Sequence, residues 1–100
     1  MAKVKITVLK RTLNEDLAAR YAPPGLTLCP RFLEGQEYIA EGQSPPAGFC
    51  GWAWHDIHKC YLTLLFGGGF GQWMKADNNM VACCTDGLRP VIFNLERIDD

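Results

Sequence analysis

Residues 80–96 have the sequence MVACCTDGLRPVIFNLE, which contains two strand signals on either side of a turn signal. Val91, Phe93 and Leu95 alternate with residues of the opposite side, which is the period of two typical of a half-buried strand. The Asp86-Gly87 pair that precedes them is a strong turn signal. We therefore predict strands at 80–85 and 90–96, joined as an antiparallel hairpin by a connection longer than the tightest turn.

The N-terminal part of the chain predicts a third strand and a short helix. Val4, Ile6 and Val8 lie on one side of residues 3–11, so this segment is expected to be a half-buried strand. Thr12 and Glu15 fit the capping box, in which a hydroxyl is followed three residues later by a glutamate. The Pro-Pro-Gly at 23–25 ends the helix that this box would start. The expected apolar face of that helix consists of Leu17, Ala18, Tyr21 and Ala22.

The middle of the chain predicts one more strand and a longer helix. Residues 36–41 are expected to be a strand, followed by a loop at 42–48 that contains two adjacent prolines. Asp56 is a good N-cap, so the second helix is expected to start near it and to end at the glycines of 67–69. The order β-α-β-α-β-β predicts a small single α+β domain over residues 1–100, with a mostly antiparallel sheet and two helices.

The composition narrows the range of partners. The chain is 48% hydrophobic and 21% charged, as in ordinary folded proteins. Its net charge of −1 argues against nucleic acid, because phosphate binding needs a clustered basic surface. The chain has no apolar run near the roughly 20 residues of a membrane-spanning helix, and residues 1–6 alternate instead of forming a signal peptide's apolar block. We expect a cytoplasmic protein with no nucleic acid or membrane partner, and leave a protein partner or a homo-oligomer open.

Cysteine is more frequent in this chain than in an ordinary soluble domain, with five residues in 100. Cys29, Cys50 and Cys60 stand alone, whereas Cys83 and Cys84 are adjacent. The chain has no Cys-x-x-Cys pair of the kind found in zinc or thioredoxin-like sites. The odd number of cysteines and a reducing compartment both favour free thiols over a disulfide framework.

The adjacent cysteines divide between the two faces of the sheet if their strand is regular. Cys84 is then expected to lie with Met80 and Ala82 on one face, and Cys83 with Val81 on the other. One thiol would be in the core while the other faces a pocket. The alternative is that both are small buried hydrophobes.

Cys29 and Cys50 stand in loops or at element ends, beside proline or glycine, which fix the backbone and permit close approach by a ligand. A site built from Cys29, Cys50 and one member of the Cys83–Cys84 pair would offer the soft ligands that suit zinc, copper(I) or an iron–sulfur cluster. Cysteines dispersed in this way cannot identify a metal by their spacing.

Thiol redox chemistry is the second use of such a site, and it needs a reactive thiol with access to solvent. Arg31, Arg89 and the helix capped by Asp56 are possible local sources of positive potential. A third hypothesis is an enzyme with a single cysteine nucleophile and His55 or His58 as its base. Surface residues at a helix start are the more ordinary explanation of both histidines, and whether the protein is an enzyme stays open.

The tryptophans offer another kind of surface. Trp52 and Trp54 share a face if their segment is extended, and Trp73 follows the glycine-rich run at 67–71. With His55 and Arg89 they would form the ligand or partner surface of a non-catalytic binding module or accessory subunit. The alternative is that the tryptophans belong to the core.

Three motifs resemble those of a family of small, uncharacterised prokaryotic proteins of about this length. They are Cys-Pro-x-Phe-x-x-Gly-Gln-Glu at 29–37, Gly-Phe-Cys-x-Trp-Ala-Trp-x-Asp-Ile at 48–57, and Cys-Cys-Thr-Asp-Gly-Leu-Arg-Pro-Val at 83–91. With the strand at 4–11, the resemblance spans nearly the whole chain. It implies that Cys29, Cys50, Cys83 and Cys84 belong to the family pattern, whereas Cys60 is incidental. It brings no activity or cofactor with it.

Overall fold

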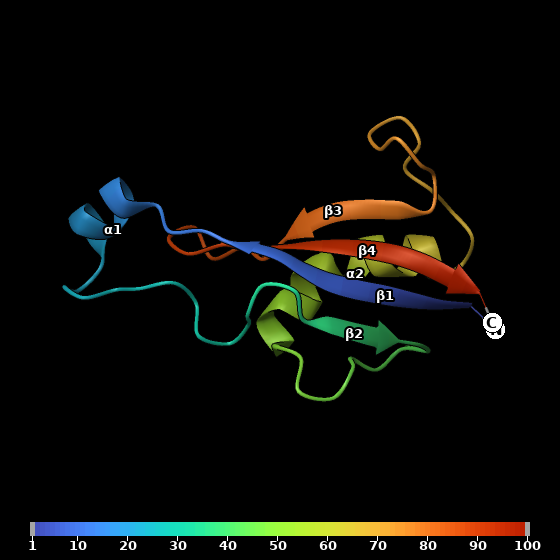
Figure 1. Ribbon diagram of the computed structural model, residues 1–100, viewed down its shortest axis with the longest axis horizontal. Helices are drawn as coiled ribbons and strands as arrows, with labels where there is room; N and C mark the ends of the chain where they lie inside the picture. Colours follow the sequence, from blue (N-terminus) through green and yellow to red (C-terminus); the bar gives the residue numbers. More distant parts are fainter. Residues whose placement is uncertain (1, 100) are drawn as a thin grey trace.

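The computed structural model describes residues 2–99 and confirms the predicted α+β class and element order (Figure 1). The elements are β1 (Ala2–Arg11), α1 (Glu15–Tyr21), β2 (Glu37–Ala40), α2 (Gly51–Leu65), β3 (Asn79–Cys83) and β4 (Val91–Asp99). None of the helices within these residues has the length and apolar character needed to cross a membrane.

The strands form one antiparallel sheet in the order β2-β1-β4-β3. The long central pair, β1 and β4, runs from Ala2 opposite Asp99 to Arg11 opposite Val91, with a register shift after Val8. The predicted hairpin is confirmed, because β3 and β4 pair antiparallel with Ala82 opposite Phe93. Its first strand ends at Cys83, so the next residues belong to the connection.

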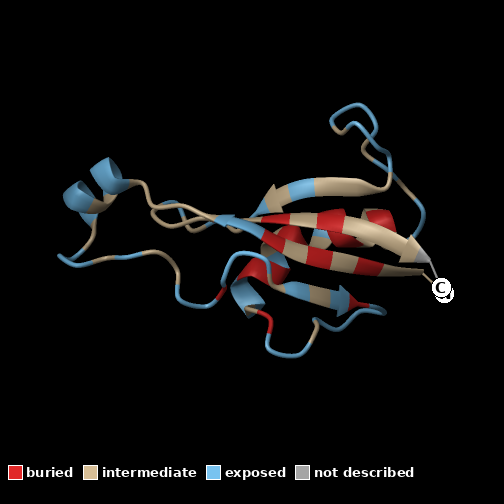
Figure 2. Ribbon diagram, in the orientation of Figure 1, coloured by how far each residue is buried: buried red, intermediate tan, exposed pale blue. Residues whose placement is uncertain are grey.

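The core lies between α2 and one face of the sheet (Figure 2). Alternate residues of β1 and β4 point into it, which is the pattern that the sequence predicts for both strands. Full burial of one such side chain stabilises the fold by about 1.5–3 kcal/mol. The largest fully buried side chains include Ile6, Phe32, Ile57, Tyr61, Leu64 and Phe93.

The helix α2 begins at Gly51, five positions before the predicted start near Asp56. Cys50 is its N-cap residue, and no side chain caps the helix. The segment around Trp52 and Trp54 is therefore helical and not extended, so the condition under which the two side chains would share a face is not met. In a helix, residues two apart do not share a face, and accordingly Trp54 is buried while Trp52 is 68% exposed. The predicted end is confirmed, because Gly67 follows the helix with φ of 90°, a left-handed conformation that favours glycine.

The helix α1 lies away from the sheet, at the far end of the molecule from the C-terminus (Figure 1). The expected capping box is wrong: Thr12 continues alongside β4, where its N–H and its hydroxyl both donate to the carbonyl of Pro90. Asn14 precedes the helix instead. The expected apolar face is not buried either, because α1 contains no buried residue and Tyr21 is 69% exposed.

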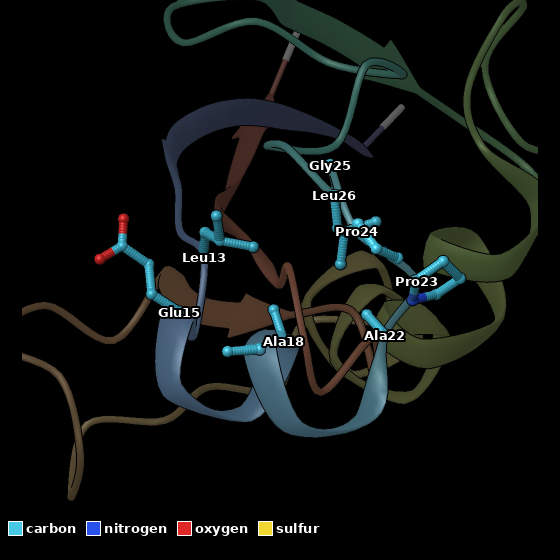
Figure 3. Close-up of a pocket in the computed structure, with 9 residues that line it drawn as sticks. Leu13, Glu15, Ala18, Ala22, Pro23, Pro24, Gly25 and Leu26 are labelled. Atoms are coloured by element: carbon cyan, nitrogen blue, oxygen red, sulfur yellow. The ribbon is translucent and has the colours of Figure 1, made fainter.

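A cavity of about 410 Å³ lies between α1 and the segment that follows it (Figure 3). Ala18, Ala22 and the prolines of 23–24 supply much of its apolar lining, and Glu15 is the charged residue in it. This lining offers little for chemistry, and the cysteines lie elsewhere.

Candidate functional site

A larger cavity, of about 540 Å³, lies where three separate segments meet: the loop before β2, the start of α2 and the connection from β3 to β4. We call it the thiol pocket. Its lining residues are Cys29, Arg31, Phe32, Cys50, Trp52, Ala53, Cys84, Thr85, Asp86, Gly87, Leu88, Arg89 and Val91.

Each of the three segments brings one free cysteine to the thiol pocket. Cys29 comes from the loop, Cys50 is the N-cap residue of α2, and Cys84 is the first residue after β3. All three are half-buried. The backbone N–H of Val91 donates to the sulfur of Cys84 at 3.4 Å, which fixes this side chain beside the start of β4. Three thiols that are far apart in the sequence therefore line one cavity.

The remaining two cysteines lie outside this group. Cys83 is exposed, while Cys84 packs against the core together with Met80 and Ala82, so the predicted division of the pair between two faces is confirmed. The expectation that one thiol lies in the core while the other faces a pocket is wrong, because Cys84 packs against the core and also lines the thiol pocket, whereas Cys83 does not line it. Cys60 is buried in the core, and burial raises the pKa of its thiol, although the charge of the adjacent lysine partly opposes this shift.

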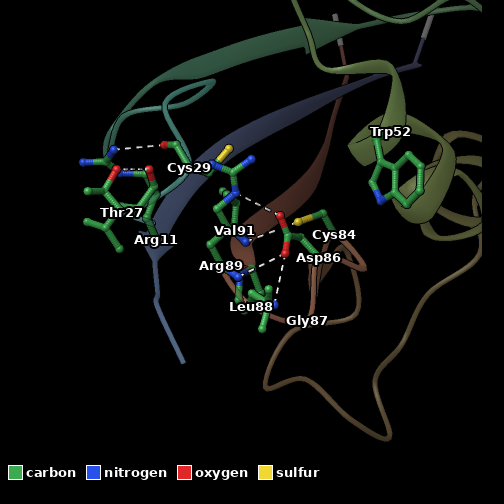
Figure 4. Close-up of polar contacts among 12 residues, drawn as sticks. Arg11, Thr27, Cys29, Trp52, Cys84, Asp86, Gly87, Leu88, Arg89 and Val91 are labelled. Carbon is green, nitrogen blue, oxygen red and sulfur yellow. Dashed lines mark hydrogen bonds and ion pairs between the residues drawn. The ribbon is translucent and has the colours of Figure 1, made fainter. Parts of the chain in front are cut away.

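Arg11 holds the Cys29 loop against β1. Its Nη1 donates to the carbonyl of Cys29 at 3.1 Å (Figure 4). Its Nε donates to Glu34 Oε1 at 3.0 Å. The backbone N–H of Arg11 also donates to Glu34 Oε2. Backbone N–H groups of Glu34 itself and of Arg11, with the guanidinium of Arg11, lower the pKa of Glu34. One arginine thus anchors both ends of the segment from Cys29 to Glu34.

Asp56 ties the Cys84 segment to α2. Its Oδ2 accepts hydrogen bonds from the backbone N–H of Thr85 at 2.7 Å and from the Thr85 hydroxyl at 2.9 Å. The same hydroxyl accepts from Nε1 of Trp52 at 3.0 Å. The expected N-cap role of Asp56 is wrong. Its carboxylate instead links α2, which follows Cys50, to Thr85, which follows Cys84.

Asp86 organises the connection between β3 and β4. Its Oδ1 accepts from the backbone N–H groups of Leu88 and Arg89, at 3.0 and 3.1 Å, and its Oδ2 accepts from Nε of Arg89 at 3.1 Å (Figure 4). Burial raises the pKa of Asp86, but these backbone and guanidinium donors together lower it below its ordinary value. The turn that the sequence places at Asp86 is therefore held by the aspartate side chain itself.

The positive groups expected near the thiols do line the thiol pocket. Arg89 is paired with Asp86 and keeps 34% of its side chain exposed. Arg31 is exposed, and within residues 2–99 its side chain makes no hydrogen bond or ion pair. The first turn of α2, which includes Trp52 and Ala53, contains no acidic residue. This turn supplies the positive end of a helix dipole beside the cavity.

A metal ion would require the thiols to rearrange. Within the described residues, histidine, cysteine, aspartate and glutamate side chains form no group of three or more that could hold a metal as they stand. The carboxylate of Asp86 is already engaged by Leu88 and Arg89. Soft-metal binding by Cys29, Cys50 and Cys84 would need their side chains to turn toward a common point.

The expected tryptophan and histidine surface is divided. Trp52 lines the thiol pocket, but Trp54 is buried and packs against Phe49 and Tyr61, so it cannot be part of a surface. Trp73 is 69% exposed in the loop before β3 and stacks on Phe70, with their ring centroids 5.7 Å apart. It does not line the thiol pocket.

The two histidines also lie outside the thiol pocket. Both belong to α2, so the expectation that His55 precedes the helix is wrong. His55 is exposed and lines a separate cavity of about 410 Å³ with Trp52 and Asp56. His58 stacks on Tyr61 with 6.1 Å between ring centroids. The pairing of a pocket cysteine with a histidine base therefore has no support in this arrangement.

Sequence reasoning missed the residues that hold the pocket together. Arg11 and Glu34 match no fixed position of the three motifs, Thr85 belongs to the last of them without an assigned role, and the partners of these residues lie 18 to 33 positions away. Comparisons with family models, with curated proteins and with solved structures found no match to this chain.

Proposed function

We propose that the thiol pocket is the functional site and that its cysteines carry out thiol redox chemistry. The observation that supports this is the meeting of Cys29, Cys50 and Cys84, three free and half-buried thiols, in one cavity beside two arginines. Thiol–disulfide exchange needs one thiolate to attack and a second thiol to resolve the mixed disulfide. In this proposal two of the three pocket thiols take these two roles, and a reducing cytoplasm would keep them ready to react.

Soft-metal binding is the second candidate. The same three sulfurs are the donors that zinc, copper(I) or an iron–sulfur cluster prefers. Metal binding requires a larger rearrangement than redox exchange, because the three side chains would have to turn toward one point. Metal analysis of protein purified without oxygen tests it. About one equivalent of metal in the wild type, lost in Cys84→Ser and kept in Cys83→Ser, would favour a metal centre over redox exchange.

The redox proposal is tested by brief alkylation of the native protein, followed by unfolding, a second label and peptide mass analysis. We expect Cys29, Cys50 and Cys84 to be labelled in the native state, with the buried Cys60 labelled after unfolding. The exposed Cys83 serves as the internal reference for an unhindered thiol.

Oxidation gives the second half of the test. After exposure to a disulfide, we expect the wild type and Cys83→Ser to form a disulfide within the pocket trio, and peptide mapping will identify the pair. We then replace Cys29, Cys50 and Cys84 by serine one at a time. The disulfide should disappear in the two variants that lack one of its own cysteines and persist in the third. The proposal fails if all three thiols resist alkylation until the protein unfolds, or if oxidation joins Cys83 in preference to them.

A further inference from the structure

The charged residues in the lining of the thiol pocket do not balance. Arg31, Arg89 and Asp86 are the charged residues in its lining, two positive and one negative. The carboxylate of Asp86 is neutralised within its own turn by Arg89, at 3.1 Å. The guanidinium of Arg31 has no acidic partner within residues 2–99. The lining of this cavity, which contains three thiols, therefore includes one positive charge without an acidic partner, while the carboxylate of Asp56 outside the lining bonds to Thr85.

The start of α2 adds to this imbalance without being a site by itself. Its first turn has no acidic residue and no side-chain cap, and two of its residues line the cavity. A group with negative charge is attracted by the positive end of a helix. The indole of Trp52 is held in place by Thr85 and offers an apolar surface beside these positive groups.

We propose that the substrates of the thiol pocket are small disulfides that carry negative charge, with Arg31 binding the anionic group while a pocket thiol attacks the disulfide. This inference rests on the proposed redox function and names its substrate class. A cavity of about 540 Å³ has the size of a small-molecule site. A guanidinium suits carboxylates and phosphates, because its N–H groups match their geometry.

The exchange proceeds in two balanced steps. In the first, one pocket thiolate attacks a sulfur of the substrate, the substrate S–S bond breaks, and one half leaves as a thiolate that takes up a proton. In the second, another pocket thiolate attacks the protein sulfur of the mixed disulfide and releases the other half in the same way. Two protein thiols are oxidised to a disulfide, the substrate is reduced to two thiols, and the protons come from the protein thiols.

The test compares three disulfide probes: oxidised glutathione, which is anionic; bis(2-hydroxyethyl) disulfide, which is neutral; and cystamine, which is cationic. The rate of loss of Cys29, Cys50 and Cys84 thiols is followed by quenching and mass analysis, and normalised to the rate for the unfolded chain. We expect the anionic probe to react fastest and the cationic probe slowest at low ionic strength. Raising the salt concentration should reduce the differences between the three reaction rates, because salt screens exposed charges.

Arg31→Gln supplies the matched variant, with Arg20→Gln as its control, because Arg20 is an exposed arginine on α1 outside the pocket. We expect Arg31→Gln to lower the ratio of anionic to neutral rates by about two- to fivefold, the range of one exposed ion pair. Arg20→Gln should leave the ratio unchanged.

The outcomes separate the two proposals. Equal normalised rates for the three probes, or an unchanged ratio in Arg31→Gln, would overturn the anionic substrate class and leave the redox function standing. If the pocket thiols react with none of the probes while Cys83 does, the redox function fails and the substrate class fails with it.

Discussion

At the scale of single residues, Asp86 has the clearest energetic role in the site. It accepts two backbone hydrogen bonds and one from Arg89 within its own turn. Asp86→Asn keeps the shape of the side chain but removes its charge. We expect the free energy of unfolding at neutral pH to fall by about 1–2 kcal/mol, at the low end for bonds to a charged group because the pair is partly exposed. Urea unfolding monitored by tryptophan fluorescence measures this change.

The same residue gives a prediction for pH. The pKa of Asp86 is lowered in the folded protein. Its stabilising effect is therefore fully present above the pKa of the unfolded chain, near 3.9, and is lost as the pH falls through the lower folded value. The difference in stability between the wild type and Asp86→Asn should shrink over this acidic range. A stability difference between the two proteins that stays constant down to the acid transition would contradict this role of Asp86. The control is Glu37→Gln, which alters an exposed carboxylate on β2.

At the scale of elements, the tie between α2 and the end of β3 decides whether Cys50 and Cys84 stay in one pocket. Asp56→Ala removes both bonds to Thr85, whereas Thr85→Ala removes those of the hydroxyl alone. We expect each substitution to destabilise the fold by about 1 kcal/mol. In the double mutant the losses should fall short of additivity by at least about 0.5 kcal/mol, because the residues share bonds. Additive losses in urea unfolding would show that the tie contributes no coupling.

The elements also show what a sequence reveals by itself. Strands β1 and β4 were predictable because their alternation records which side faces the core. The start of α2 was missed because Asp56 is a strong cap signal, yet its carboxylate is used by Thr85 in another element. A better signal was present: Ala53, Trp54, Ile57, Cys60, Tyr61 and Leu64 follow helical spacing, and all are buried.

The pocket was predictable in part, for a similar reason. The proline and glycine beside Cys29 and Cys50 mark segments where the backbone changes direction, and such segments line the cavity. Whether Cys84 or Cys83 lines the pocket depends on which side of β3 faces the core. The pairing of β3 with β4 sets this side, and alternation in the sequence does not reveal it. The anchoring of Cys29 by Arg11 depends on a bond across 18 positions, and local sequence carries no record of it.

In the whole molecule, the chain divides into a packed body, made of the sheet and α2, and an arm that carries α1 (Figure 1). The molecule measures 46 × 30 × 20 Å, and its radius of gyration of 14.5 Å exceeds the about 13 Å of a compact domain of this length. The arm carries α1 and is tied to the site by Asn14, whose side chain donates to the carbonyl of Gly87 and whose N–H donates to that of Leu88. The body carries the core and the thiols.

This division predicts very different costs for apolar substitutions in the two helices. Leu17 on α1 is 41% exposed and belongs to a helix without buried residues, so Leu17→Ser should change the free energy of unfolding by less than about 0.5 kcal/mol. Ile57 on α2 is fully buried against the sheet, and Ile57→Ala should cost about 2–5 kcal/mol, because it leaves a cavity. Urea unfolding of both variants under one condition decides the matter. A loss for Leu17→Ser comparable to that for Ile57→Ala would mean that α1 is part of the cooperative core. The thiol pocket would then depend on the arm through Asn14, whereas the predicted contrast makes α2 and the sheet sufficient to hold the cysteines in place.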